Sequence, residues 1–280
     1  MLYFGRYKGK VNSQYHLSVL AFCQSQNGVD FERSGTIALK PQQFEGSEDK
    51  LAVENPTIVE LDGVKYVFHT AVKLKEGGGG VIAATRVISG KELTGLNSNR
   101  QMVLDPKEIG KTMGRNIDMV KEPEFIRLKD DSWRVFYEFA DGQTSRIGMA
   151  WSPNLIGPYQ EHRLLIDVRS EGWDCQHVSP GPILMTSRGD ILMLYNGRGP
   201  KSVDDQTPQW AIGTVIIDAV QGGIFEGSRC NKPIIVPPEE IGPGNQLIAF
   251  ANSVVPEEQR LYYTVADTRS RVARLALDNI

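Results

Sequence analysis

The chain has 280 residues, 40% of them hydrophobic and 8% aromatic, and its 31 Lys and Arg against 34 Asp and Glu give a formal charge of −3. A chain of this length holds one or two domains, and an all-β domain often reaches it alone. The near-neutral balance, without a run of basic residues, argues against nucleic acid or an anionic membrane as the main partner. A neutral small molecule is the expected partner.

Short apolar runs rich in Val, Ile, Tyr and Phe follow one another along the chain, and a helical period is almost absent. Polar turns of hairpin type separate these runs. The predicted strands cover residues 15–25, 55–63, 64–72, 81–87, 123–129, 132–140, 146–152, 181–187, 190–198, 210–218, 247–255, 260–267 and 271–278. The sequence therefore predicts an all-β protein without convincing helices.

The strands also repeat in a fixed order: a proline, an apolar strand, a polar turn and a second strand with aromatic residues. The prolines of three copies, Pro56, Pro123 and Pro182, lie 67 and 59 residues apart. A fourth copy covers residues 250–277, and a partial fifth covers residues 2–31. Five such sheets around an axis make a five-bladed β-propeller.

This propeller is predicted to be a single domain over residues 1–280, and a β-sandwich is the alternative. The repeat also places an inner strand ahead of Met1, so the first blade is expected to be incomplete.

The cysteines indicate a reducing compartment, because Cys23, Cys175 and Cys230 are far apart and odd in number. The first residues lack the features of a secretory signal, and no apolar run approaches the length of a membrane span. We therefore expect a cytoplasmic protein. The four His form no close pair, so no metal site is expected.

Polar residues near the start of each inner strand are the candidate site, because a propeller brings these strand ends together at its central channel. Carboxylates, amides and aromatic faces around a pocket are the usual means of holding and cleaving a sugar. The candidates are Glu54, Asn55, His69, Asp118, Glu122, Glu124, Glu138, Trp173, Asp174, His177, Asn196, Arg198, Tyr263 and Asp267.

Several of these residues also have a purely structural interpretation. Strand alternation puts Glu122 and Glu124 on one face, which is either functional or a solvated edge. Glu138 either faces the channel or pairs with an Arg, and His69 is either a ligand contact or a core histidine. Trp173 either faces a substrate or packs inside the protein.

The motifs NPTIVELDGVKYVFHTA, EPEFI, IGMAWSPNLIGPY, GPILMTSRGDILMLYNG and LYYTVADTRSRVARLAL together resemble glycoside hydrolase family 130 over nearly the whole chain. The resemblance implies a five-bladed propeller that acts on β-mannosides as a phosphorylase or a hydrolase. Five-bladed arabinanases and fructosidases share the proline-headed inner strand and are the nearest alternatives.

The chain departs from the family at the expected general acid. The family usually carries Glu-Asp-Pro-Arg on its second blade, with the Asp as acid, whereas residues 54–57 here are Glu-Asn-Pro-Thr. An amide cannot deliver a proton at neutral pH, so that role does not carry over to Asn55.

The basic residues that hold phosphate in the family's phosphorylases are mostly missing as well. The resemblance assigns Arg6 to the first of these positions, whereas Glu138, His177 and Asn196 occupy the regions of the others. Such a set is poor for a multiply charged anion, so hydrolysis is favoured.

An inverting hydrolase needs one carboxyl group as acid and another as base. The resemblance implies Glu138 or Glu124 as the base. The acid is expected among Glu54, Glu122 and Asp174, with Asp174 first because Trp173 would desolvate it. No cofactor is implied; the alternatives are a non-catalytic carbohydrate-binding propeller and a phosphorylase with a remodelled phosphate site.

Overall fold

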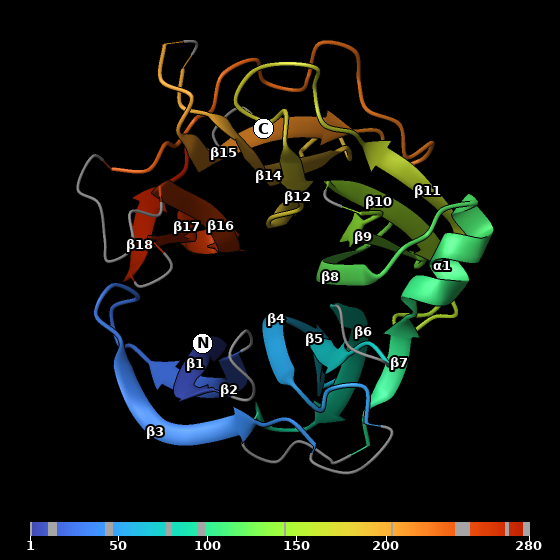
Figure 1. Cartoon of the computed structure of the whole chain (residues 1–280), viewed down its shortest axis with the longest axis vertical. Helices are drawn as coiled ribbons and strands as arrows, with labels where there is room; N and C mark the ends of the chain where they lie inside the picture. The colour runs from blue at the N-terminus through green and yellow to red at the C-terminus, as the bar shows by residue number, and fades with distance from the viewer. Residues whose placement is uncertain are drawn as a thin grey trace. The chain divides into compact units, whose positions relative to one another are not determined.

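Strands make up nearly all the regular secondary structure of the described residues, which confirms the prediction of an all-β fold (Figure 1). The computed structural model gives side chains from residue 18 onwards. It describes residues 2–10, 16–42, 47–76, 80–93, 99–142, 144–202, 204–238, 247–266 and 269–276.

The chain divides into two compact units. Unit 1 comprises residues 1–123, 139–142 and 151–162, and unit 2 comprises residues 124–138, 143–150 and 163–280. The number of blades, their closure around an axis and the single domain over residues 1–280 stay predictions.

Unit 1 begins with two groups of antiparallel strands. They are β1 (Leu2–Lys10), β2 (His16–Gln24) and β3 (Glu32–Leu39), followed by β4 (Ala52–Leu61), β5 (Val64–Leu74), β6 (Val81–Gly90) and β7 (Gln101–Leu104). One parallel residue pair, Ser18 with Ala52, joins the two groups. Apolar side chains from β2, β3, β4, β5 and β6 form a buried cluster between the strands.

The next group contains β8 (Met119–Arg127), β9 (Trp133–Ala140), β10 (Ser145–Ser152) and β11 (Gln160–Ile166), hydrogen-bonded in that order. Its residues are divided between the two units. Every side chain of β9 is buried, including those of Arg134 and Glu138, which interrupt its otherwise apolar run.

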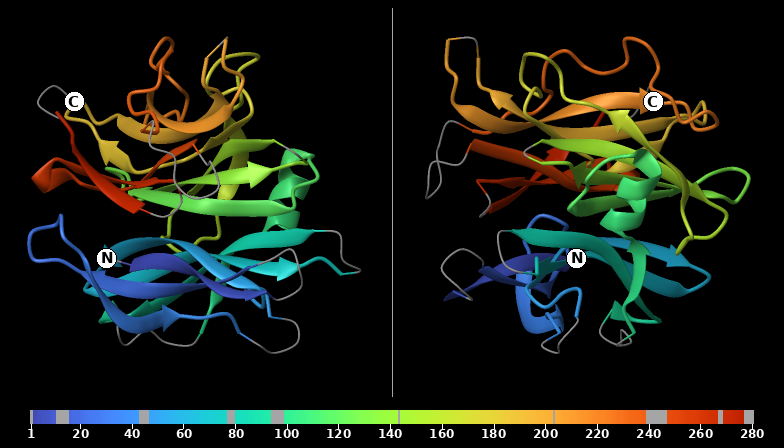
Figure 2. Two further views of the ribbon diagram at one scale, coloured as in Figure 1. Left: turned by 60° about the vertical axis from the view of Figure 1, so that its left-hand side comes forward. Right: turned by 45° about the vertical axis from the view of Figure 1, so that its right-hand side comes forward.

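Unit 2 continues with two further antiparallel groups. They are β12 (His177–Ser179), β13 (Ile183–Met185), β14 (Ile191–Pro200) and β15 (Pro208–Ile217), then β16 (Leu247–Val255), β17 (Arg260–Val265) and β18 (Arg269–Arg274). The last three strands lie side by side, as the orange and red ribbons of Figure 2 show. Two parallel residue pairs connect β15 with β16.

Register shifts occur in several strand pairs, and two of them are β-bulges on β4 and β16. On β4, Glu54 pairs with Thr70 but Thr57 pairs with Phe68, so β4 carries one extra residue. On β16 the extra residue is Asn252, between the pairs made by Ala251 and Ser253. A bulge shifts the alternation of side chains and re-aims those beside it.

One helix, α1 (Pro106–Met113), contradicts the expectation of a chain without helices. The Asp105 side chain caps its first turn by accepting from the Lys107 N–H at 2.8 Å. Pro106 occupies the first turn, and Gly114 ends the helix in the left-handed conformation, with φ of 64°. Asp-Pro at the start and Gly at the end are the usual sequence signals of a helix, so α1 was predictable.

Within the described ranges, no helix has both the length and the apolar character that a membrane crossing requires.

Candidate functional site

Three of the predicted site residues come together in unit 1. Asn55 on β4 donates a hydrogen bond from Nδ2 to Oε1 of Glu122 on β8. The preceding residue, Glu54, accepts at Oε1 a hydrogen bond of 2.5 Å from the hydroxyl of Ser18. All three are half-buried, so each is held by the protein and still partly open to solvent.

Asn55 and Glu122 share an unusual backbone conformation. Their φ angles are 50° and 51°, in the left-handed region, and each directly precedes a proline, Pro56 or Pro123. This region is uncommon for residues other than glycine, and among them Asn adopts it most readily. The Thr57 hydroxyl also donates to the Pro123 carbonyl at 2.7 Å, so two hydrogen bonds connect these segments.

His69 on β5 is fully buried in unit 1. Burial lowers its pKa from 6.5 to about 3, and a backbone hydrogen bond with Val67 offsets only part of this shift. The imidazole is therefore neutral and out of a ligand's reach. This corrects the prediction of a substrate contact and favours the core histidine.

Asp174, the first-ranked general acid, lies inside unit 2 with 0% of its surface exposed. Arg229 Nη2 lies 2.6 Å from its Oδ2 and Arg169 Nη1 lies 3.3 Å from its Oδ1. The Tyr195 hydroxyl donates to Oδ2 at 2.8 Å, and burial raises the pKa of that phenol, which keeps it a donor. Both carboxylate oxygens are thus engaged within the protein, and the geometry disfavours an acid role.

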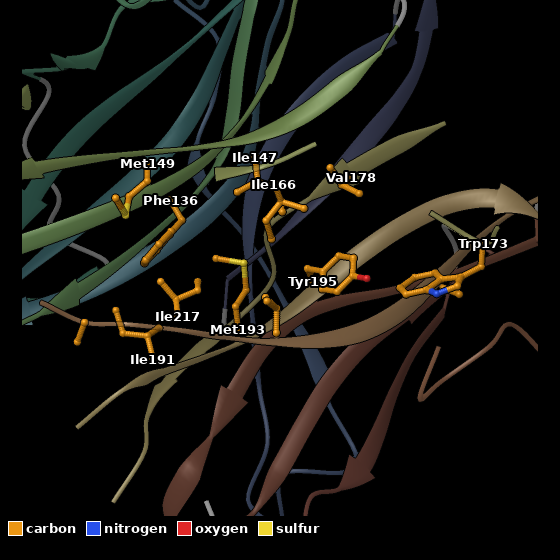
Figure 3. Close-up of a cluster of buried hydrophobic side chains, with 13 residues drawn as sticks. Phe136, Ile147, Met149, Ile166, Trp173, Val178, Ile191, Met193, Tyr195 and Ile217 are labelled. Atoms are coloured by element: carbon orange, nitrogen blue, oxygen red, sulfur yellow. The ribbon is translucent and has the colours of Figure 1, made fainter. Parts of the chain in front are cut away.

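Trp173 is packed inside the protein and does not face a substrate. It is 7% exposed, and its ring centroid lies 5.3 Å from that of Tyr195. Figure 3 shows the two side chains next to each other. A Cβ added at Gly197 or Gly213 would come within 2.6 Å of the indole. The glycines of β14 and β15 therefore make room for this ring, which corrects the prediction of a substrate-facing Trp173.

Asn196 is also structural in this arrangement. Its side-chain oxygen accepts from the Ala251 N–H at 2.7 Å, and its amide donates to the Pro180 carbonyl at 3.2 Å. Asn196 is fully buried, so it links β14 to the neighbouring β16 and does not offer its amide to a ligand. Tyr263 on β17 is half-buried and packs against the apolar cluster between β14 and β17.

His177, Arg198 and Trp210 form a half-buried row across β12, β14 and β15. Nδ1 of His177 accepts the Ser145 N–H at 3.2 Å, so this nitrogen carries no proton. The His177 ring stacks on Trp210 with centroids 6.0 Å apart, and Phe250 contacts Trp210 edge-on. Sequence reasoning missed Trp210 and Ser145, because strand register, not sequence proximity, brings them to His177.

The positions of four further predicted residues can be stated only in part. Glu124 on β8 is half-buried, and Glu138 on β9 is 1% exposed. Arg6 lies on β1 opposite Ser18, but its side chain is outside what the structure describes. Asp267 lies outside the described residues.

Two surface hollows of about 300 and 250 Å³ lie elsewhere in unit 1, beside β2 and β3 and beside α1. Asp118 lines the hollow beside α1, and none of the other predicted site residues that the structure describes lines either hollow. In the described part of the chain, no group of three or more His, Cys, Asp and Glu side chains is placed to hold a metal ion.

No family model matches the chain, and no curated protein matches its sequence. Solved structures do match it. One of them is 18% identical with a TM-score of 0.74, and the match covers 97% of this chain and 79% of that chain. It is described in the words "The GH130 family of mannoside phosphorylases contains glycoside hydrolases that target beta-1,2 mannosidic linkages in Candida mannan". The chain has the glycoside hydrolase family 130 fold.

Two other solved structures also match this chain. The β-1,2-mannobiose phosphorylase from Listeria innocua, in complex with β-1,2-mannobiose, is 18% identical with a TM-score of 0.71, over 93% of this chain and 68% of that one. An endo-arabinase from Bacteroides thetaiotaomicron is 11% identical with a TM-score of 0.65, over 98% and 89%. The fold is therefore shared with the arabinan-degrading alternative.

If Asp174 is structural, Asp174→Asn will lower the free energy of unfolding by about 3 kcal/mol, because it leaves two guanidinium groups without their buried partner. Urea denaturation followed by tryptophan fluorescence measures this loss. Asp167→Asn is the matched control, since Asp167 pairs with Arg146 at the surface; it will cost less than about 1 kcal/mol. Equal losses in the two variants would contradict the structural role.

The neutral, buried His69 predicts a pH dependence of stability. Its pKa is about 3 in the folded protein and roughly 6.5 when unfolded, so below pH ~6.5 only the unfolded chain takes up the proton. This single group will lower the free energy of unfolding by about 1.4 kcal/mol per pH unit down to its folded pKa. His69→Gln and His69→Leu will both show a shallower decline between neutral and mildly acidic pH. The same slope in wild type and both variants would contradict the assignment.

Proposed function

We propose that this protein is a five-bladed propeller glycosidase of glycoside hydrolase family 130 that hydrolyses β-mannosides. The observation that carries the proposal is the hydrogen-bonded pair Asn55 and Glu122 on a chain with this fold. A fold alone does not assign chemistry, and it is this pair that puts a carboxyl group beside the position where the family resemblance expects the acid.

Hydrolysis is favoured over phosphorolysis because the residues at the expected phosphate positions do not suit an anion. His177 uses Nδ1 to accept a backbone N–H, so that nitrogen is already engaged within the protein. Asn196 is buried and its amide is engaged by backbone groups. Glu138 is a carboxyl group, which offers no cation to a phosphate. Arg6 alone would be left to bind a phosphate, which usually requires several cationic or N–H donors.

The reaction requires an acid that protonates the leaving oxygen and a base that takes a proton from the attacking water. Glu124 and Glu138 stay the residues proposed as base. For the acid, Glu54 and Glu122 are stronger candidates than Asp174, because their side chains are partly exposed whereas that of Asp174 is completely buried. No cofactor or metal is proposed.

The first substrate to test is β-1,2-mannobiose, because two of the matching structures are described with β-1,2-linked mannosides. The remaining candidate residues, among them Arg198, Tyr263 and Asp267, are proposed as contacts to its hydroxyl groups. A non-catalytic sugar-binding protein is the second candidate, and the specific observation in its favour is the amide at position 55.

Incubation with β-1,2-mannobiose, with and without inorganic phosphate, will release free mannose at the same rate in both conditions. Chromatography of the products measures this. Mannose 1-phosphate formed only with phosphate would identify a phosphorylase, and binding without release would identify a sugar-binding protein. Arabino-oligosaccharides are the matched control and are expected to remain intact.

The proposed base is tested by Glu124→Gln and Glu138→Gln. One of them is expected to lower kcat on β-1,2-mannobiose by roughly 10²- to 10⁴-fold, because the attacking water loses its proton acceptor. Glu60→Gln, at an exposed carboxylate of β4, is the control and will leave kcat unchanged. Full activity in both test variants would show that the base is another residue.

A further inference from the structure

The side chain at position 55 is an amide, so it has a hydrogen-bond donor but no acidic proton. The family resemblance places a carboxylic acid there, and this chain has an amide whose Nδ2 donates to Oε1 of Glu122. An Asp at this position could not donate when ionised, and it would set a second negative charge against Glu122. The change from carboxyl to amide thus turns a repulsive neighbour of Glu122 into a supporting one.

The two residues that make this contact have the same backbone conformation and the same place in their repeats. Asn55 and Glu122 are the equivalent residues of successive copies, each before its proline and each with left-handed φ. Such conformations are strained for residues other than glycine and persist when the surroundings hold them in place. Here the Asn55 to Glu122 bond and the Thr57 to Pro123 bond hold the two segments together.

We propose that Glu122 is the general acid of this protein and that Asn55 is its positioning residue; the inference rests on the proposed glycosidase function. Because the Asn55 amide donates to Oε1, that oxygen acts as the carbonyl oxygen of the neutral acid and the transferable proton resides on Oε2. Asn55 therefore fixes which oxygen of Glu122 delivers the proton.

The chemical step balances with one water molecule as the only co-reactant. The Oε2 proton of Glu122 moves to the glycosidic oxygen as the bond from that oxygen to the anomeric carbon breaks, and the leaving sugar departs as an alcohol. The water oxygen bonds to the anomeric carbon and gives its proton to the base. Solvent exchange then returns a proton to Glu122.

The hydrogen bond from Asn55 to Glu122 becomes stronger as the proton leaves Glu122. This bond becomes charge-assisted once the carboxyl group is ionised, and such bonds are roughly twice as strong as neutral ones. An interaction that strengthens along the reaction lowers the barrier, whereas one that is constant does not.

Two substrates that differ only in the leaving group test the proposal with the full chain. β-1,2-Mannobiose has a poor leaving group that needs protonation, whereas 2,4-dinitrophenyl β-mannoside has a good one that does not. Glu122→Gln is expected to lower kcat on mannobiose by roughly 10²- to 10⁴-fold and on the dinitrophenyl substrate by far less. Asn55→Ala is expected to act in the same selective way, by about 10- to 100-fold on mannobiose.

Two control variants separate positioning from scaffolding. Thr57→Val removes the other hydrogen bond between the same segments and will change both substrates by the same small factor. Glu60→Gln will change neither substrate. Circular dichroism checks folding, and if Glu122→Gln does not fold, Asn55→Ala still gives the selective readout.

The outcomes separate this inference from the function on which it rests. Equal losses on both substrates, or full activity of Glu122→Gln on mannobiose, would overturn the role of Glu122 and leave the glycosidase function standing. No turnover of either substrate by the wild-type protein would overturn the function itself, and the acid role with it.

Discussion

The constraint on which the candidate site depends is the left-handed backbone in front of Pro56 and Pro123. Side chains of a regular strand alternate between its two faces, and a residue with positive φ departs from that order. At these two positions the Asn55 amide and the Glu122 carboxylate are hydrogen-bonded to each other across neighbouring repeats. The strain of the left-handed backbone is offset by the hydrogen bonds between the two segments, including that from the Thr57 hydroxyl to the Pro123 carbonyl.

Burial separates structural acids from candidate catalytic ones. Asp174 is completely buried between two guanidinium groups and a phenol, so replacing it would break a network that holds unit 2 together. Glu54 and Glu122 are half-buried, and they accept hydrogen bonds from a hydroxyl and an amide. A carboxyl group that is partly open to solvent can exchange a proton with water.

The strands were predictable because their hydrophobic period is strong, and α1 was overlooked although Asp105 and Gly114 mark its ends. The role of Asp174 was not predictable, because Arg229, its partner at 2.6 Å, lies 55 residues further along the chain. A Trp next to an Asp looks the same in the sequence whether the pair packs in the core or lines a binding site. The Asn55 to Glu122 contact spans 67 residues, yet the repeat already made these two residues equivalent.

The most direct measurement is a crystal structure of the wild-type protein with a thio-linked β-1,2-mannobiose, in which sulfur replaces the glycosidic oxygen and prevents cleavage. The account predicts Glu122 Oε2 within hydrogen-bonding distance of that sulfur, with Asn55 Nδ2 still on Oε1. A complex in which the sulfur faces Asp174, or in which Asn55 has left Glu122 to bind the sugar, would contradict it.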